Sequence, residues 1–157
     1  MRLLVISDSH KRGDLVDRII CREKEARHVF FLGDVVSDIE DFVYEYTDRI
    51  FHIVSGNCDF FSEFPATEMV DIDGTRVFFT HGHTYNVKYT TSTLSDAART
   101  RDCKIALYGH THISNIEYAD GLYLVNPGTI SGSRSGQCSY AVIDIEQGGI
   151  MPIIKKV

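Results

Sequence analysis

The chain has 157 residues, of which 43% are hydrophobic and 24% are charged, a composition typical of soluble globular proteins. At this length we expect a single domain spanning residues 1–157. The formal net charge of -6 argues against general binding of nucleic acids, although bound cations would still let a phosphorylated substrate approach.

The sequence contains no sign of a membrane-spanning segment. No apolar run approaches the roughly 18 residues that a transmembrane helix needs, and the apolar segment 1–7 is too short for a signal peptide. The four cysteines are widely spaced, without a Cys-x-x-Cys pair, which favours reduced thiols. We therefore predict a cytoplasmic protein that does not bind membranes.

The first third of the chain alternates buried strands with helices. Short apolar runs at Arg2–Ser7, Val29–Leu32 and Ile50–Val54 predict three strands. Between them, apolar residues recur at helical spacing from Gly13 to about Ala26, and again from Ile39 to Tyr46. This β-α-β-α-β order is typical of a parallel sheet with right-handed crossovers.

The second half has a different pattern, dominated by hairpin signals. Two β-type runs flank Asp73-Gly74, a strong turn sequence. We expect this half to be mostly antiparallel, and the whole chain to form two mixed sheets stacked face to face with helices outside. The predicted features are, in chain order, strands Glu68–Ile72 and Thr75–Thr80, a helix over about Thr91–Arg101, a strand Ile105–Tyr108, and hairpin turns at Asp120-Gly121 and Gly148-Gly149.

Possible metal ligands follow five of the predicted strands, at the point where each strand ends. Because sites in α/β sheets form outside the carboxyl ends of strands, we expect these side chains to gather in one place. Aspartate and asparagine are ordinary turn residues, but four histidines in that role would be unusual, so the pattern favours a metal site. The seven candidates are Asp8, His10, Asp34, Asn57, His81, His110 and His112.

The donor set indicates which metals could bind. Three oxygen donors and four imidazoles, without a thiolate, disfavour a closed structural zinc site. Such a set suits divalent manganese, iron, cobalt, nickel or zinc and does not choose among them. Manganese is the metal we expect first. If one carboxylate bridges, the seven side chains give four bonds to each of two metals and leave positions for water and substrate. Two such metals can activate a bridging water and bind the oxygens of a phosphoryl group.

Five motifs in order carry a family resemblance: Asp-x-His, Gly-Asp, Gly-Asn, His-Gly-His and Gly-His-Thr-His. Together they resemble the calcineurin-like metallophosphoesterase superfamily. The size, the Gly-Asn-Cys-Asp sequence at 56–59 and the Asn-Pro-Gly-Thr sequence at 126–129 are similar to its small, single-domain phosphodiesterase branch in bacteria and archaea. The resemblance implies a four-layer α/β/β/α sandwich, in agreement with the expected sheets.

The resemblance also implies roles for the seven residues. It implies hydrolysis of a small-molecule phosphate ester, most of all a phosphodiester, by a metal-bridging hydroxide, with Asp34, Asn57 and His81 in the catalytic centre. One metal would be held by Asp8, His10, Asp34 and His112, and the other by Asp34, Asn57, His81 and His110, with Asp34 bridging.

The resemblance is incomplete at Cys58, where many larger members carry a histidine thought to protonate the leaving group. A thiol has a reference pKa near 8.5 and is a poor general acid at neutral pH. His83 could supply a proton or support the ligands from behind. Arg134 could clamp a phosphate with its planar guanidinium or be only a solvated loop charge. Asp59 could orient the site or cap a turn. His28 and His52 are better explained as hydrogen-bonded structural residues.

A second hypothesis belongs to a different class of protein. The resemblance extends to a retromer subunit in which the same fold serves assembly rather than hydrolysis. Such a scaffold does not need all seven ligands, and this chain has all seven, which favours the enzyme. Pairing into a homo-oligomer stays open.

Overall fold

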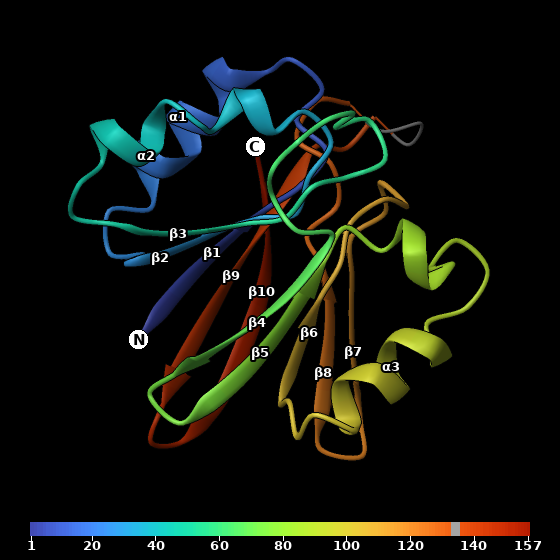
Figure 1. Cartoon of the computed structure of the whole chain (residues 1–157). Coiled ribbons are helices and arrows are strands. Elements are labelled where there is room, and N and C mark those ends of the chain that lie inside the picture. Colours follow the sequence, from blue (N-terminus) through green and yellow to red (C-terminus); the bar gives the residue numbers. More distant parts are fainter. Residues whose placement is uncertain (133–135) are drawn as a thin grey trace.

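The computed structural model describes residues 1–132 and 136–157. Two five-stranded sheets form its centre, and a few short helices cover them (Figure 1). Within the described ranges, no helix is long and apolar enough to cross a membrane.

The first sheet contains the predicted parallel strands. Strand β1 (Arg2–Ile6) is followed by β2 (His28–Phe31) and β3 (Ile50–Ile53), and all three run parallel. On the other side of β1, β9 (Ser139–Glu146) pairs antiparallel, and β10 (Gly149–Lys156) follows it. The strand order is therefore β10-β9-β1-β2-β3, and β1 is the central strand of the sheet.

The second sheet has the order β4-β5-β6-β8-β7. Its two hairpins, β4–β5 and β7–β8, are antiparallel as expected, whereas β5, β6 and β8 run parallel to one another. The chain crosses over through a helix between β5 and β6, which makes that pair parallel. It then runs through β7 at the edge of the sheet before β8 returns beside β6, which makes the second pair parallel. The strands are β4 (Thr67–Ile72), β5 (Thr75–Thr80), β6 (Ile105–Leu107), β7 (Asn115–Ala119) and β8 (Leu122–Asn126).

The helices are shorter than the periodicity suggested. Helix α1 (Gly13–Arg22) ends before Ala26, and α3 (Ser92–Arg99) is close to its predicted range. The helix predicted around Ile39–Tyr46 shrinks to α2 (Phe42–Glu45), in which no side chain is buried. Two single 3₁₀ turns, η1 (Val36–Asp38) and η2 (His83–Tyr85), follow the ligand motifs of β2 and β5.

Three apolar layers separate the elements and produce the four-layer α/β/β/α sandwich that the sequence predicted. Leu4, Ile6 and Phe31 face α1 on the outer side of the first sheet, whereas Leu3 and Phe30 face the second sheet. The outer side of the second sheet packs against α3 through a third cluster. The alternation within β1 follows from the period of two in a strand, and both faces are buried because both are covered.

Candidate metal centre

The structure brings the seven sequence-predicted ligands together across both sheets. The amide of Asp8 donates to the carbonyl of Gly33 at 3.1 Å, and the amide of Gly109 donates to the carbonyl of His81 at 2.9 Å. The amide of His110 then donates to Asp8 Oδ2 at 3.2 Å. These bonds join the loops after β1, β2, β5 and β6 at one edge of the sandwich.

Most of the candidate ligands have an unusual backbone. Positive φ is uncommon for residues other than glycine and costs on the order of 1–3 kcal/mol per residue. Such strain persists only where the surrounding structure holds it, and it gathers at functional sites. The candidates in this region are Asp8 (φ 55°), His10 (φ 43°), Asp34 (φ 60°), His110 (φ 66°) and His112 (φ 62°).

Two glycines let the loops approach closely. A Cβ atom on Gly56 would lie 2.2 Å from Asp34 Oδ1, and one on Gly109 would lie 2.0 Å from the Ser7 hydroxyl. Both distances are far below van der Waals contact. The glycine in each Gly-Asn or Gly-His motif is therefore required so that a neighbouring ligand carboxylate or its support can fit beside the backbone.

Four of the candidates form a compact group, in which one donor atom of each lies within 4.8 Å of the others: Asp8, His10, Asp34 and His112. His112 Nε2 lies 3.1 Å from Asp8 Oδ1 and 3.3 Å from His10 Nε2. His10 Nε2 lies 3.9 Å from Asp34 Oδ2. The donor atoms of all four side chains thus converge on one point.

Asp8 is fully buried and lacks a complete set of partners. Its Oδ2 accepts hydrogen bonds from the Ser7 hydroxyl and the His110 amide, but its Oδ1 has no hydrogen bond of normal geometry in the described part of the chain. Burial raises the pKa of Asp8, and His112, His81 and Ser7 more than offset this, so that the pKa lies below its usual value. The adjacent Asp8 carboxylate in turn raises the pKa of His112 despite partial burial. A buried anionic oxygen that faces His112 alone, without a hydrogen bond of normal geometry, is what a bound cation would satisfy.

The other candidates meet around His81. Its Nε2 lies 3.2 Å from Asn57 Oδ1, 3.1 Å from His110 Nδ1 and 3.5 Å from Asp34 Oδ1. Its Nδ1 lies 2.7 Å from the Leu32 carbonyl, which can only accept, so Nδ1 carries the proton and the Nε2 of a neutral ring does not. Of its three neighbours, only the ring nitrogen of His110 could donate a hydrogen bond to this Nε2. The oxygens of Asn57 and Asp34 are acceptors. An unprotonated nitrogen facing acceptor oxygens suits a metal ion.

Asp34 lies between the two groups. Its Oδ1 faces His81 and its Oδ2 faces His10, and the amide of Cys58 donates to Oδ1 at 3.0 Å. Asp34 is therefore the candidate carboxylate whose two oxygens face the two groups of donors. The donor types and the unsatisfied oxygen of Asp8 therefore fit divalent cations at this edge.

Asp59 supports this arrangement from behind, a role that the sequence left undecided. Its carboxylate accepts the amides of Asp34 at 2.9 Å and Gly56 at 2.7 Å. It also accepts those of Val35 and Val36, each at 2.8 Å. Val35 has φ 78°, which is rare for a β-branched residue. Asp59 thus both orients the site and caps a turn.

The loop after β8 supports the other side of the site. The Asn126 amide group donates to the Gly109 carbonyl at 3.0 Å. The hydroxyls of Thr129 and Ser131 donate to the Asp8 carbonyl at 2.8 and 3.0 Å. The sequence Asn-Pro-Gly-Thr carried a family signal, but only the contacts reveal that it holds Asp8 and Gly109 in place.

Three further residues are candidates for proton donation or substrate binding: Cys58, His83 and Arg134. The Cys58 side chain is exposed, yet partial burial and the nearby Asp34 raise the pKa of its thiol to about 11. The His83 ring lies 5.4 Å from that of His81, and its buried Nδ1 has no hydrogen-bond partner in the described residues. Burial, and then His81, lower the pKa of His83. Arg134 lies outside the described residues.

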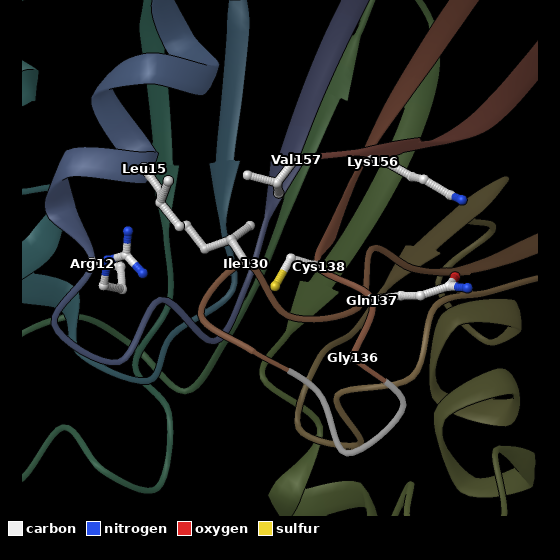
Figure 2. A pocket seen from close by; sticks show the side chains of 8 residues that line it. All are labelled: Arg12, Leu15, Ile130, Gly136, Gln137, Cys138, Lys156 and Val157. Carbon is white, nitrogen blue, oxygen red and sulfur yellow. The ribbon is translucent and has the colours of Figure 1, made fainter.

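A pocket of about 410 Å³ lies on the α1 side of the loop after β8 (Figure 2). Leu15, Ile130 and Val157 form its apolar part, and Arg12 and Lys156 bring positive charge to it. None of the seven candidate ligands lines this pocket, so it is separate from the convergent donors.

Comparison with known proteins agrees with this geometry. The family model of the calcineurin-like phosphoesterase superfamily domain matches residues 1–148. The chain belongs to the calcineurin-like phosphoesterase superfamily. This membership accounts for the order of the motifs and for the two mixed sheets.

Relatives of known sequence carry related names. The chain is 29% identical over 148 residues to "Probable metallophosphoesterase YsnB" of Bacillus subtilis, covering 93% of this chain and 85% of that protein. It is 27% identical over 168 residues to "Phosphodiesterase YfcE" of Escherichia coli K12, covering 92% and 88%.

Solved structures show the same fold at low identity. A Streptococcus pneumoniae protein described as a predicted phosphoesterase has a TM-score of 0.81 at 24% identity, over 98% of this chain and 97% of that one. Vps29 of Entamoeba histolytica, in a structure that contains zinc, has a TM-score of 0.78 at 21% identity, over 99% of each chain.

Proposed function

We propose that this superfamily member is a metal-dependent phosphoesterase of one domain, acting on a small-molecule phosphate ester and preferring a phosphodiester. The observation that carries the proposal is the sharing of Asp34 between two sets of convergent donors. The first set contains the buried Asp8 Oδ1, which has no hydrogen bond of normal geometry, and the second contains His81, whose Nε2 faces the acceptor oxygens of Asn57 and Asp34. A site kept only for folding would not need either feature.

In this proposal Asp8, His10, Asp34 and His112 hold one divalent metal, and Asp34, Asn57, His81 and His110 hold the other. Manganese is the metal we expect first. Bound metals would supply positive charge to the phosphoryl oxygens and lower the pKa of a bound water.

The chain's own residues supply the geometry. Leu32 fixes the His81 tautomer so that Nε2 faces the site, and Asp59 holds the backbone of Asp34. Asn57 offers its amide group at the exposed rim of the site. Cys58 sits where a proton donor is expected, so esters with good leaving groups are the substrates we expect to turn over fastest.

The test is turnover of bis-p-nitrophenyl phosphate and of p-nitrophenyl phosphate by metal-free protein loaded with Mn²⁺. We expect metal-dependent hydrolysis, faster for the diester. Asp34→Asn should lower kcat by at least about a hundredfold, because it weakens both sets of ligands. Absence of metal-dependent turnover on either ester would refute the enzyme, and a fully active Asp34→Asn variant would remove Asp34 from its shared role.

The scaffold hypothesis has one specific observation in its favour. Large apolar side chains on the ligand loops are exposed, namely those of Phe60, Tyr89 and Ile113, and exposed apolar groups can mark a partner surface. Because the Entamoeba Vps29 structure itself contains zinc, metal content alone does not separate the two hypotheses. Metal binding without turnover across a panel of phosphate esters would favour the scaffold.

A further inference from the structure

A groove of about 870 Å³ is lined by residues of β3, the edge strand of the first sheet, and of the segments around it. Its walls are α2 and the segment 61–65, its floor is β3, and Glu68 of β4 closes one side. In Figure 1, α2 and β3 lie on the same side of the molecule. None of the seven candidate metal ligands lines it.

The groove is strongly negative. Four exposed carboxylates line it, and no lysine or arginine does so within the described part of the chain. His52 adds no charge near neutral pH, because burial lowers its pKa to about 4. None of the carboxylates forms an ion pair with a described residue. They are Glu40, Asp41, Glu63 and Glu68.

Aromatic side chains lie among these carboxylates. Phe51 and Phe64 are partly buried against the core beneath the groove. Tyr44 and Phe61 are 82% and 103% exposed. Phe61 also has φ 66°, a costly conformation for a side chain that gains no burial. Carboxylates interleaved with open aromatic faces suit a cationic ligand with apolar parts.

The floor of the groove offers unpaired backbone groups. In the described chain β3 pairs with β2 alone, and the amides of Ile50 and Val54 donate to β2-side carbonyls. By alternation, the amides and carbonyls of Phe51 and Ile53 point to the outer edge. Beyond them the Ser55 amide bonds to the Pro65 carbonyl at 2.9 Å, so the free edge is short.

We propose that this groove binds a short, extended, basic segment of a partner protein. The segment pairs with the backbone of Phe51 and Ile53 as an added strand. Its alternate side chains place apolar groups on the aromatic faces and lysine or arginine beside the four carboxylates. A second copy of this chain does not fit, because a two-fold contact would bring the same carboxylates together.

The experiment uses the full chain and a fluorescein-labelled octapeptide that alternates arginine or lysine with valine or phenylalanine. Fluorescence anisotropy should show saturable binding that weakens with salt. Neutralising the carboxylates (Glu40→Gln, Asp41→Asn, Glu63→Gln, Glu68→Gln) should weaken binding roughly tenfold or more. A control variant, Glu117→Gln with Glu146→Gln, removes two exposed carboxylates elsewhere and should leave binding unchanged.

Backbone pairing is tested separately. Two peptides are compared, one N-methylated at its odd-numbered amides and the other at its even-numbered amides. One of them should lose binding, because its methyl groups block the amides that face β3, and the other should bind as before. In ¹⁵N spectra the amides of Phe51 and Ile53 should shift on adding the peptide. The same peptide with glutamate for each basic residue should not bind.

Several results would overturn the proposal. They are no binding of the basic octapeptide, equal binding by the neutralised groove, indifference to N-methylation in both registers, and equal competition by spermine, which would mark a small-cation site. A dimer in solution that covers Phe51 and Ile53 would also overturn it. None of these readouts depends on phosphoesterase activity.

Discussion

Asp59 illustrates how a single carboxylate can hold a strained backbone. Each of its oxygens accepts two amides, and the four donors belong to the loops after β2 and β3. The left-handed conformations of Asp34 and Val35 persist because these bonds fix the turn. Asp59 therefore acts on metal binding through Asp34 rather than by touching a metal.

Asp59→Asn tests this role. In asparagine an NH₂ group would replace one of the two oxygens and would face the two backbone N–H groups that this oxygen accepts. We therefore expect a loss of about 1–3 kcal/mol in unfolding free energy. Mn²⁺ affinity should fall as well, because Asp34 loses its orientation. Urea unfolding and metal titration check both effects. Asp96→Asn, an exposed change on α3, is the control; an Asp59→Asn protein with unchanged metal affinity would contradict the role.

Gly109 provides a steric test of the ligand loops. Gly109→Ala would place a Cβ atom 2.0 Å from Ser7 Oγ and 2.8 Å from Asp8 Oδ2. We expect a loss of roughly 1–3 kcal/mol in stability from overpacking and weaker metal binding. Adding Ser7→Ala should restore part of the stability, as measured by thermal unfolding of metal-free protein. If the double variant gains nothing, the contact with Ser7 is not the cause.

At the scale of elements, the adjacent strands β2 and β3 carry a pair of histidines, of which His28 is buried and His52 is partly buried. His28 Nδ1 lies 2.9 Å from His52 Nε2, and the rings stack with centroids 5.2 Å apart. Burial, followed by the charge of His28, lowers the pKa of His52 to about 4. Burial also lowers the pKa of His28. The structural interpretation of these two residues agrees with their contacts.

This pair predicts a pH dependence of stability. Because the folded pKa of His52 lies below the unfolded value near 6.5, its stabilising contribution is complete above about pH 6.5 and is lost as the pH falls toward 4. His52 is partly exposed, so screening limits the loss to about 1–2 kcal/mol. Denaturant unfolding at several pH values from 7 to 4 gives the unfolding free energy at each pH. This free energy should fall less steeply with decreasing pH in His52→Phe than in the unaltered protein. An identical slope would remove His52 as the source.

At the scale of the whole molecule, the candidate metal centre draws on both sheets. Its candidate ligands follow β1, β2 and β3 of one sheet and β5 and β6 of the other. A ligand that binds only the folded chain stabilises it by about 2.7 kcal/mol at a hundred times its Kd. Metal binding should therefore stabilise the sandwich as a unit.

The corresponding prediction concerns metal removal. Treatment with a chelator should lower Tm, and Mn²⁺ should restore it in proportion to the logarithm of its concentration. The increase of Tm on adding Mn²⁺ should largely disappear in the His112→Ala and Asp34→Asn variants, because each lacks a candidate ligand. The Glu117→Gln variant should keep the full increase, and an equal Mn²⁺ effect in all four proteins would show that the ion acts elsewhere.

The sequence by itself determined the parallel β1, β2 and β3, the hairpins and the ligand motifs. Apolar periodicity, turn residues and glycine-linked polar side chains are local signals that need no partner. Tertiary structure decided the short α2. Ile39, Phe42 and Tyr46 pack against the first core, but the residues before them are held in the 3₁₀ turn η1 by the bonds of Asp59 to Val35 and Val36. Tertiary structure also decided the parallel pairing of β5, β6 and β8. The sequence of a connection does not say beside which strand the next strand will lie. The tertiary structure also assigned Asp59 and Thr129 their supporting contacts, because bonds to backbone amides and carbonyls of other loops leave no pattern in the chain itself.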